Sequence, residues 1–128
     1  MDNLAVGIAD VEAAADRIKG HAVRTPLLNA PLLDADIGRR IFVKAECLQK
    51  TGSFKYRGAK NAVQSLSDED RKAGVIAFSS GNHAQGVALA AREAKVSAVI
   101  IIPFHTPHTK IFFFLFLERK THGVVDAS

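Results

Sequence analysis

The spacing of apolar residues divides the chain into short helices and strands. Near the amino terminus, apolar residues between Val11 and Ile18 recur at i, i+3, i+4 and i+7, which is the spacing of one face of a helix. Asp10 and Gly20 are typical start and stop residues on either side of them. The pattern therefore predicts an amphipathic helix that is capped by Asp10.

The middle of the chain is predicted to be less regular. Residues 25–31 contain two prolines and are expected to form an extended connection, and residues 32–35 add a helical turn. The apolar residues 41–43 predict a short strand. Ser53 has the hydroxyl of a helix N-cap and precedes a helix that we predict over 54–66.

The clearest unit lies in the carboxyl-terminal half. A strand over 75–78, a loop over 79–82, a helix over about 83–94 and a strand over 96–102 follow one another. The second strand is nearly continuously apolar and β-branched, as a strand buried on both faces of a parallel sheet should be. Strands that alternate with helices of about ten to fifteen residues are typical of an α/β fold, so we predict a partial, doubly wound parallel sheet.

Composition and charge limit the partners. With 128 residues, of which 48% are apolar and 23% charged, the chain has the size and composition of one globular domain. The net charge of +4 comes from basic residues that are scattered along the sequence. Binding of nucleic acid requires basic residues gathered on one face with aromatic residues between them, so this class of partner is not expected.

The chain shows no targeting or membrane signal. Its first residues lack the basic region and long apolar run of a secretory signal. The longest apolar run near the end, residues 111–117, is shorter than the roughly 17–25 residues of a membrane span. The single cysteine, Cys47, cannot form an internal disulfide and is expected to be a buried apolar filler. We therefore expect a cytoplasmic protein that does not bind membranes.

One lysine stands at a position suited to covalent chemistry. Lys55 follows a glycine and a serine in T-G-S-F-K-Y-R-G, residues 51–58, at the start of a predicted helix. A lysine attacks a carbonyl only as the neutral amine, and both the helix N-terminus and the nearby Arg57 disfavour the ammonium form. Lys55 is therefore a candidate nucleophile for carbonyl chemistry. The alternative is an ordinary solvated lysine that follows a turn.

A second motif, S-S-G-N-H-A-Q-G at residues 79–86, has the features of an anion-binding loop. It leaves the carboxyl end of a predicted strand and opens a helix, where free N–H groups bind carboxylates or phosphates. Ser79, Ser80 and Asn82 add hydrogen-bonding side chains, and Gly81 exposes its amide. The alternative is a turn in which Ser80 or Asn82 caps the helix itself.

The histidines are weaker candidates. His83 lies in the first turn of the predicted helix, where a histidine is more often structural than an acid or base. His105 and His108 have an H-x-x-H spacing, but no Cys, Asp or Glu stands near them, so no metal site is predicted. The chain has neither a Walker loop nor a G-x-G-x-x-G motif, which argues against nucleotide binding.

Both motifs lie within longer stretches that follow a known pattern. These stretches read F-V-K-A-E-C-L-Q-K-T-G-S-F-K-Y-R-G-A at 42–59 and V-I-A-F-S-S-G-N-H-A-Q-G-V-A-L-A-A at 75–91, accompanied by R-T-P-L at 24–27 and I-I-P-x-x-T-P-x-x-K at 101–110. Together they resemble the serine/threonine dehydratase (threonine ammonia-lyase) group of fold-type II pyridoxal-phosphate enzymes. The resemblance implies a truncated sheet of the tryptophan synthase β-like type.

The resemblance also implies a cofactor and roles for the site residues. Lys55 would bond covalently to pyridoxal 5'-phosphate and later move the proton at the substrate's Cα. Phe54 would lie against one face of the pyridine ring, and Asn82 would hydrogen-bond the ring's 3′-oxygen. The loop that holds the carboxylate of the amino-acid substrate would consist of Ser79, Ser80, Gly81, Asn82 and His83. Ser80 would be a second catalytic residue, because it occupies the position that faces Cα opposite the lysine in racemising relatives.

The implied reaction is loss of water from threonine or serine, followed by release of ammonia to give a 2-oxo acid. The alternatives are the amino-terminal part of a serine racemase or of a hydroxyaspartate dehydratase, a non-catalytic fragment, and a small anion-binding module. Full-length relatives are expected to be homo-oligomers.

The chain departs from this family towards its end. The family's glycine-rich phosphate-binding loop, and the residue that partners the pyridine nitrogen, would lie beyond residue 128. Residues 1–110 therefore correspond to the amino-terminal part of a dehydratase domain. Residues 111–128 are expected to be a divergent tail, which is either read out of frame or the translated end of a truncated gene. We expect the chain alone to be inactive.

Overall fold

Helices and short strands make up most of residues 6–103, the part of the chain that the computed structural model describes. In chain order they are α1 (Ile8–Ile18), β1 (Leu27–Asn29), α2 (Pro31–Ile37), β2 (Phe42–Lys44), the 3-10 helices η1 (Glu46–Leu48) and η2 (Lys50–Gly52), α3 (Lys55–Gln64), α4 (Asp68–Ala73), β3 (Val75–Phe78), α5 (Asn82–Ala94) and β4 (Ala98–Ile101).

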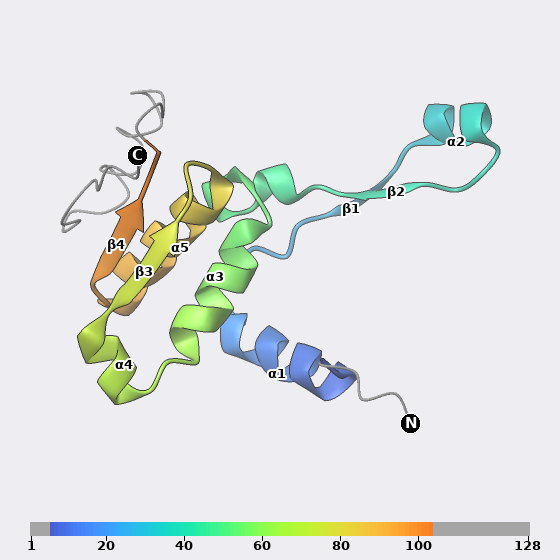
Figure 1. The fold of residues 1–128 in the computed structure, drawn as a ribbon. Coiled ribbons are helices and arrows are strands. Elements are labelled where there is room, and N and C mark those ends of the chain that lie inside the picture. Colours follow the sequence, from blue (N-terminus) through green and yellow to red (C-terminus); the bar gives the residue numbers. More distant parts are fainter. Residues whose placement is uncertain (1–5, 104–128) are drawn as a thin grey trace.

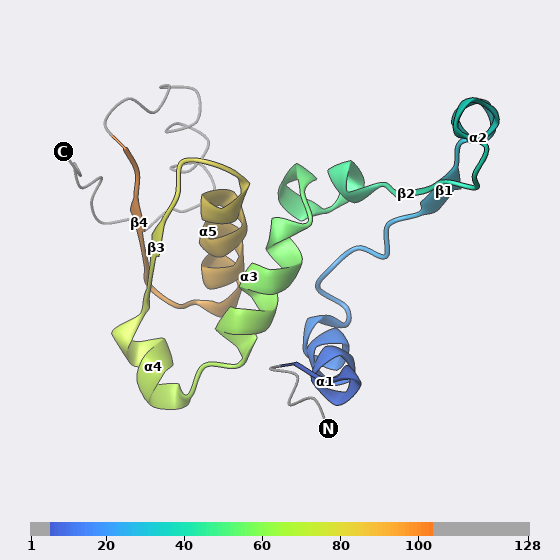
Figure 2. The same ribbon diagram turned by 45° about the vertical axis from the view of Figure 1, so that its right-hand side comes forward.

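Helix α5 lies at the centre of the structure, between a sheet and a second helix (Figure 1, Figure 2). On one side it packs against the parallel pair β3–β4, in which Val75 pairs with Ala98 and Phe78 with Ile101. On the other side it packs against α3, which in turn contacts α1. The alanines of α5 let both neighbours approach closely, and most of them are fully buried.

The hydrophobic core fills the space between these layers. It is formed by Tyr56, Ala59, Val63, Ala77, Ala84, Val87, Leu89, Ala90, Ala91, Val96, Ala98, Ile100 and Ile102. Residues from α3, α5 and the two parallel strands therefore form one continuous cluster, which fixes the two helices relative to each other and to the sheet.

An arm formed by β1, α2 and β2 projects away from these layers (Figure 1). Its strands pair antiparallel, with Leu27 opposite Lys44 and Asn29 opposite Phe42, and every residue of both strands is exposed. Sequence analysis predicts only an extended connection before α2. The structure differs because the chain reverses at Gly38, with φ 69°, and returns alongside itself.

The β–α–β unit is confirmed. Strand β3 occupies the predicted residues, α5 begins one residue earlier than predicted, and β4 is shorter than the predicted strand. The two strands are parallel, as an α/β fold requires. The second strand is predicted to be buried on both faces, and this is met fully on one face only: in β4, Ala98 and Ile100 are buried, while Val99 and Ile101 are half-buried. In β3, Ala77 is buried, while Ile76 and Phe78 are 70% and 63% exposed. Among the described elements, α5 covers one face of this sheet and none covers the other.

Three local predictions need correction. Asp10 does not begin its helix, because α1 starts at Ile8 and the Asp10 carboxylate accepts a hydrogen bond from the Gly7 N–H at 2.8 Å from inside the first turn. Helix α3 is shorter than predicted at both ends, with Phe54 at its N-cap position. Cys47 is exposed rather than buried, because η1 turns Glu46 and not the cysteine towards its neighbours.

The predictions for His105, His108 and residues 111–128 concern residues outside the described part of the chain. None of the helices within residues 6–103 is long and apolar enough to cross a membrane. Over the same residues, no group of three or more metal-binding side chains comes together.

Candidate active site at two helix N-termini

Two helix N-termini lie side by side at one end of the structure (Figure 1, Figure 2). A Cβ on Gly86, in the second turn of α5, would stand 3.1 Å from the carbonyl carbon and oxygen of Lys55 and 3.2 Å from the amide nitrogen of Tyr56. The absence of a side chain on Gly86 therefore allows the two backbones to touch. As a result Lys55 and the loop of residues 79–83 share one end of a parallel helix pair.

The segment before α3 is sharply bent. Thr51 has φ 61° and Gly52 has φ 68°, so both are left-handed, and this conformation is strained for a β-branched threonine. The Thr51 hydroxyl is buried and has no hydrogen-bond partner within the described residues. The buried Ser53 accepts a hydrogen bond from the Lys55 N–H at 3.3 Å, as an N-cap side chain would. The bend leaves Phe54 and Lys55 at the surface.

Phe54 and Lys55 face solvent together. The Phe54 ring is 59% exposed, and the Lys55 Nζ lies 5.1 Å from its centroid. Within residues 6–103, no carboxylate stands at ion-pairing distance from this amine. Arg57, the cation expected to act beside Lys55, is instead paired with Glu46 at 2.7 Å. The Lys55 amine therefore remains available to a ligand.

The loop after β3 leads directly into α5. The Ser79 hydroxyl accepts a hydrogen bond from the Gly81 N–H at 3.2 Å. No side chain caps α5, so the N–H groups of its first turn have no partner within the described residues. The alternative in which Ser80 or Asn82 caps the helix is therefore wrong. Ser80 is half-buried, while Asn82 and His83 are exposed.

Glu46 ties the start of α3 to the segment before β1. It accepts hydrogen bonds from Arg57 Nε at 2.9 Å and Nη2 at 2.7 Å, and one from the Thr25 hydroxyl. The hydrogen bonds from Arg57 lower the pKa of Glu46 to about 2, against the effect of burial, with Thr25 and the charge of Lys44 adding to the lowering. A two-point contact between a guanidinium and a carboxylate fixes direction as well as distance.

Glu93 near the end of α5 gathers three donors. It accepts hydrogen bonds from Lys50 Nζ at 2.8 Å, from the Tyr56 hydroxyl at 2.6 Å and from Lys60 Nζ at 2.9 Å. Both Tyr56 and Lys60 are fully buried. Burial alone would raise the pKa of Glu93, but the hydrogen bonds from Lys50, Tyr56 and Lys60 outweigh it and lower the pKa to about 2. Burial and this carboxylate together raise the pKa of Tyr56.

Sequence analysis predicts neither carboxylate cluster, because each carboxylate binds groups from other parts of the chain. One signal does exist in the sequence. Lys60 falls on the apolar stripe of α3, four residues after Tyr56 and next to Ala59, with Val63 one turn further on. A lysine on a buried stripe requires an acidic partner, since an unpaired buried charge is very costly.

Acid is expected to unfold the chain by protonating Glu46 and Glu93. Each pKa is about 2 in the folded state and 4.5 without the fold, so the stabilisation is complete above about pH 4.5 and is lost as pH falls towards 2. The urea midpoint, followed by circular dichroism, should fall over this range. Glu46→Gln should weaken the dependence, whereas Glu12→Gln on the exposed side of α1 should not. Equal pH dependence in the parent and both variants would contradict this prediction.

The fold and this end of the helix pair define an α/β domain that presents an exposed lysine amine at the same end as a helix N-terminus without a side-chain cap. The chain belongs to the pyridoxal-phosphate dependent enzyme family, whose model matches residues 18–124. The match extends past Lys110 into the segment that we expect to diverge, and the divergence of that segment stays a prediction. The expected fold and cofactor class are confirmed by this membership.

Relatives with different activities match this chain. It is 53% identical over 102 residues to an L-threo-3-hydroxyaspartate ammonia-lyase from a Pseudomonas species, covering 80% of this chain and 32% of the relative. It is 46% identical over 106 residues to an L-threonine ammonia-lyase from Thermotoga maritima, covering 83% of this chain and 26% of that relative. The structure of maize serine racemase matches with a TM-score of 0.88 at 40% identity, covering 97% of this chain and 37% of that one. The chain spans between 26% and 37% of the length of these relatives.

Proposed function

We propose that this chain carries the lysine-bearing part of a pyridoxal-phosphate-dependent ammonia-lyase that acts on threonine or serine. The observation that carries the proposal is the unpaired Lys55 amine beside the exposed Phe54 ring, at the same end of the helix pair as residues 79–83. An amine, an aromatic surface and an anion-binding loop suit the aldehyde and ring of the cofactor and the carboxylate of an amino acid.

The exposed groups suit the cofactor in chemical type. The Lys55 amine would hold its aldehyde carbon, the Phe54 ring would lie against the pyridine, and the exposed Asn82 amide would hydrogen-bond the ring oxygen. When bound, pyridoxal phosphate supplies the carbonyl carbon for an amine and a ring that withdraws electrons from the substrate's Cα. A buried or ion-paired lysine would not suit this role, and Lys55 is neither within the described residues.

The loop of residues 79–83 would bind and orient the substrate. The first N–H groups of α5 have no side-chain cap and point out of the helix end, where the partial positive charge favours a carboxylate. The side chains of Ser79, Ser80, Asn82 and His83 and the amide of Gly81 would complete this contact. Such an orientation would bring the substrate's Cα hydrogen towards the lysine on the neighbouring helix.

Lys55 would also move protons in the reaction. With the substrate held by its carboxylate, and its amino group in the place of Lys55 on the cofactor, the freed Lys55 amine would take the proton from Cα. The hydroxyl on Cβ would leave together with that proton as water. The enamine that is released then reacts with water to give a 2-oxo acid and ammonia. A general base at this position contributes about 10²–10⁴-fold to the rate.

Two observations support a second candidate substrate and a second reaction. The relative at 53% identity is an L-threo-3-hydroxyaspartate ammonia-lyase, and 3-hydroxyaspartate has the same β-hydroxyl as threonine and serine. The half-buried Ser80 hydroxyl has no hydrogen-bond partner within the described residues and stands in the loop that faces the lysine-bearing helix, so a proton carrier for racemisation is the alternative role.

A chimera tests the proposed function. Residues 18–103 of this chain would replace the aligned part of the Pseudomonas L-threo-3-hydroxyaspartate ammonia-lyase, and release of 2-oxo acid would be measured with L-threonine, L-serine and L-threo-3-hydroxyaspartate. We expect 2-oxo acid from at least one of them. Ser80→Ala is the companion variant, since it should lower formation of D-serine far more than it lowers loss of water. A chimera that binds pyridoxal phosphate but forms neither 2-oxo acid nor D-serine would contradict the proposal.

A further inference from the structure

We propose that Glu93 is a positioning residue that holds both ends of the segment carrying Lys55. Lys50 stands directly before the bent residues 51–54, Tyr56 stands directly after Lys55, and both bond to the Glu93 carboxylate. The importance of this segment rests on the proposed function, in which Lys55 bonds the cofactor. The contacts themselves do not depend on that function.

Each oxygen of the Glu93 carboxylate contacts a different end of this segment. At the upstream end of the segment, Oε1 accepts a hydrogen bond from Lys50 Nζ at 2.8 Å. At the downstream end, Oε2 accepts a hydrogen bond from the Tyr56 hydroxyl at 2.6 Å. One carboxylate from α5 therefore clamps the residues that flank the lysine, while Lys55 itself is left unpaired within the described residues.

Lys60 fixes the carboxylate in place. Its ammonium is fully buried and lies 2.9 Å from Glu93 Oε2. A buried ammonium loses heavily if it is separated from its counterion, so the carboxylate is not free to swing towards solvent. The pair also links α3 to α5 about two turns beyond the contact at Gly86, so the two helices are held in register at two separate points.

The clamped segment needs such support because its conformation is strained. Thr51 is left-handed with a β-branched side chain, a strained conformation that persists only when the surrounding residues hold it. The buried Thr51 hydroxyl also lacks a hydrogen-bond partner within the described residues, so no hydrogen bond of this side chain offsets the backbone strain. If either end were released, the segment would relax and the direction of the Lys55 side chain would no longer be set.

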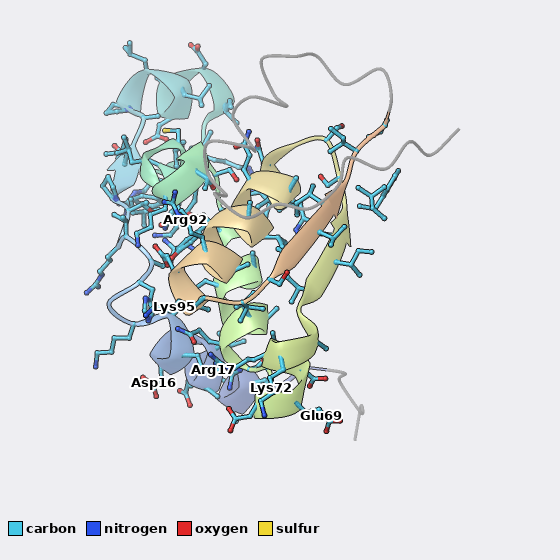
Figure 3. All side chains as sticks on the ribbon, turned by 90° about the vertical axis from the view of Figure 1, so that its left-hand side faces the viewer. Asp16, Arg17, Glu69, Lys72, Arg92 and Lys95 are labelled. Atoms are coloured by element: carbon cyan, nitrogen blue, oxygen red, sulfur yellow. The ribbon has the colours of Figure 1, made fainter. Side chains whose placement is uncertain are left out.

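Two conservative variants of the full chain test this role. Lys50→Gln removes the upstream bond and Tyr56→Phe removes the downstream bond, while both keep the buried pair of Lys60 and Glu93. Arg92→Gln is the control, because Arg92 is the neighbour of Glu93 on α5, is exposed and loses the same charge as Lys50→Gln (Figure 3). Glu93 itself stays in place, since its removal would leave Lys60 buried without a counterion.

The first readout is amide hydrogen exchange of residues 51–57, which needs no cofactor. The N–H groups of Gly52, Lys55 and Arg57 donate hydrogen bonds to residues 49, 53 and 54, so loosening of the segment exposes them. We expect about tenfold faster exchange in Lys50→Gln and in Tyr56→Phe, the factor typical of one lost hydrogen bond to a charged group. The exchange in Arg92→Gln should stay at the parent rate. In the two test variants, the acceleration at residues 51–57 should exceed what the change in the unfolding midpoint of the whole chain accounts for. Exchange at the parent rate in both test variants would overturn the proposal.

The second readout is the rate at which borohydride traps pyridoxal phosphate on Lys55. It should fall several-fold in both test variants, and Lys50→Arg, which keeps the ion pair, should restore it. If the parent chain is not labelled on Lys55, the proposed function is contradicted. Faster amide exchange in the two variants would in that case still support the positioning role of Glu93. Labelling of Lys55 at parent rates in both variants would instead overturn the positioning role of Glu93 and leave the proposed function standing.

Discussion

Replacing Lys55 with methionine is expected to abolish the capture of pyridoxal phosphate on the segment 51–57. Reduction with borohydride and peptide mapping of the full chain should find the label on this segment in the parent and not in Lys55→Met. In the chimera, the same substitution should lower 2-oxo acid release by about 10²–10⁴-fold, the contribution typical of a positioned base. Methionine keeps the length and the apolar stem of the side chain, so the effect isolates the amine.

Lys72→Met is the matched control for this prediction. Lys72 is an exposed lysine on α4, at the end of the structure opposite the loop of residues 79–83 (Figure 3). Its replacement should leave both the label and the activity of the chimera unchanged. A label spread over many surface lysines, and equally strong in Lys55→Met and Lys72→Met, would show that Lys55 has no special role.

Replacing Gly86 with valine is expected to have the largest effect on stability. The first added carbon would stand 3.1 Å from the Lys55 carbonyl, and the atom it meets belongs to helix backbone that cannot rotate away. The helices must then separate, and overpacking of this kind costs about 1–3 kcal/mol in the free energy of unfolding. Separation would also move Lys55 away from the loop of residues 79–83. Urea unfolding and borohydride trapping would measure the two consequences.

Gly58→Val provides the comparison within the neighbouring helix. Gly58 lies in α3, is exposed, and would place its added carbon in open space with nothing within 4 Å. Valine is slightly better than glycine in a helix interior, so the free energy of unfolding should change by less than about 0.5 kcal/mol. An equal loss in the free energy of unfolding in Gly58→Val and Gly86→Val would mean that the close approach at Gly86 does not limit the packing of α3 against α5.

Short-range patterns in the sequence were sufficient to predict the β3–α5–β4 unit. Its strands are apolar runs and its helix has a regular apolar face, so each element is specified by residues within one window. Lys55 and residues 79–83 were found for the same reason, since each motif is local. Membership of the pyridoxal-phosphate dependent family confirms the predicted class, while the role of each site residue stays a prediction.

Contacts between distant segments were not predictable in this way. The antiparallel arm depends on two three-residue strands, which are too short to carry a clear alternation. The contact at Gly86 depends on how closely α3 and α5 approach, and a glycine inside an apolar helix does not reveal its neighbour. Residue type predicts a buried Cys47, because cysteine is usually buried, but the hydrogen bonds of Glu46 turn η1 so that the cysteine is exposed.

The parallel packing of α3 against α5 also determines what recombination can transfer. The lysine, the loop and both carboxylates that brace them come from one unbroken stretch, residues 46–93, and the projecting arm contributes none of them. One crossover on each side of that stretch therefore moves the whole set between relatives. Under the proposed function, a lineage can exchange its substrate preference without rebuilding its reactive amine.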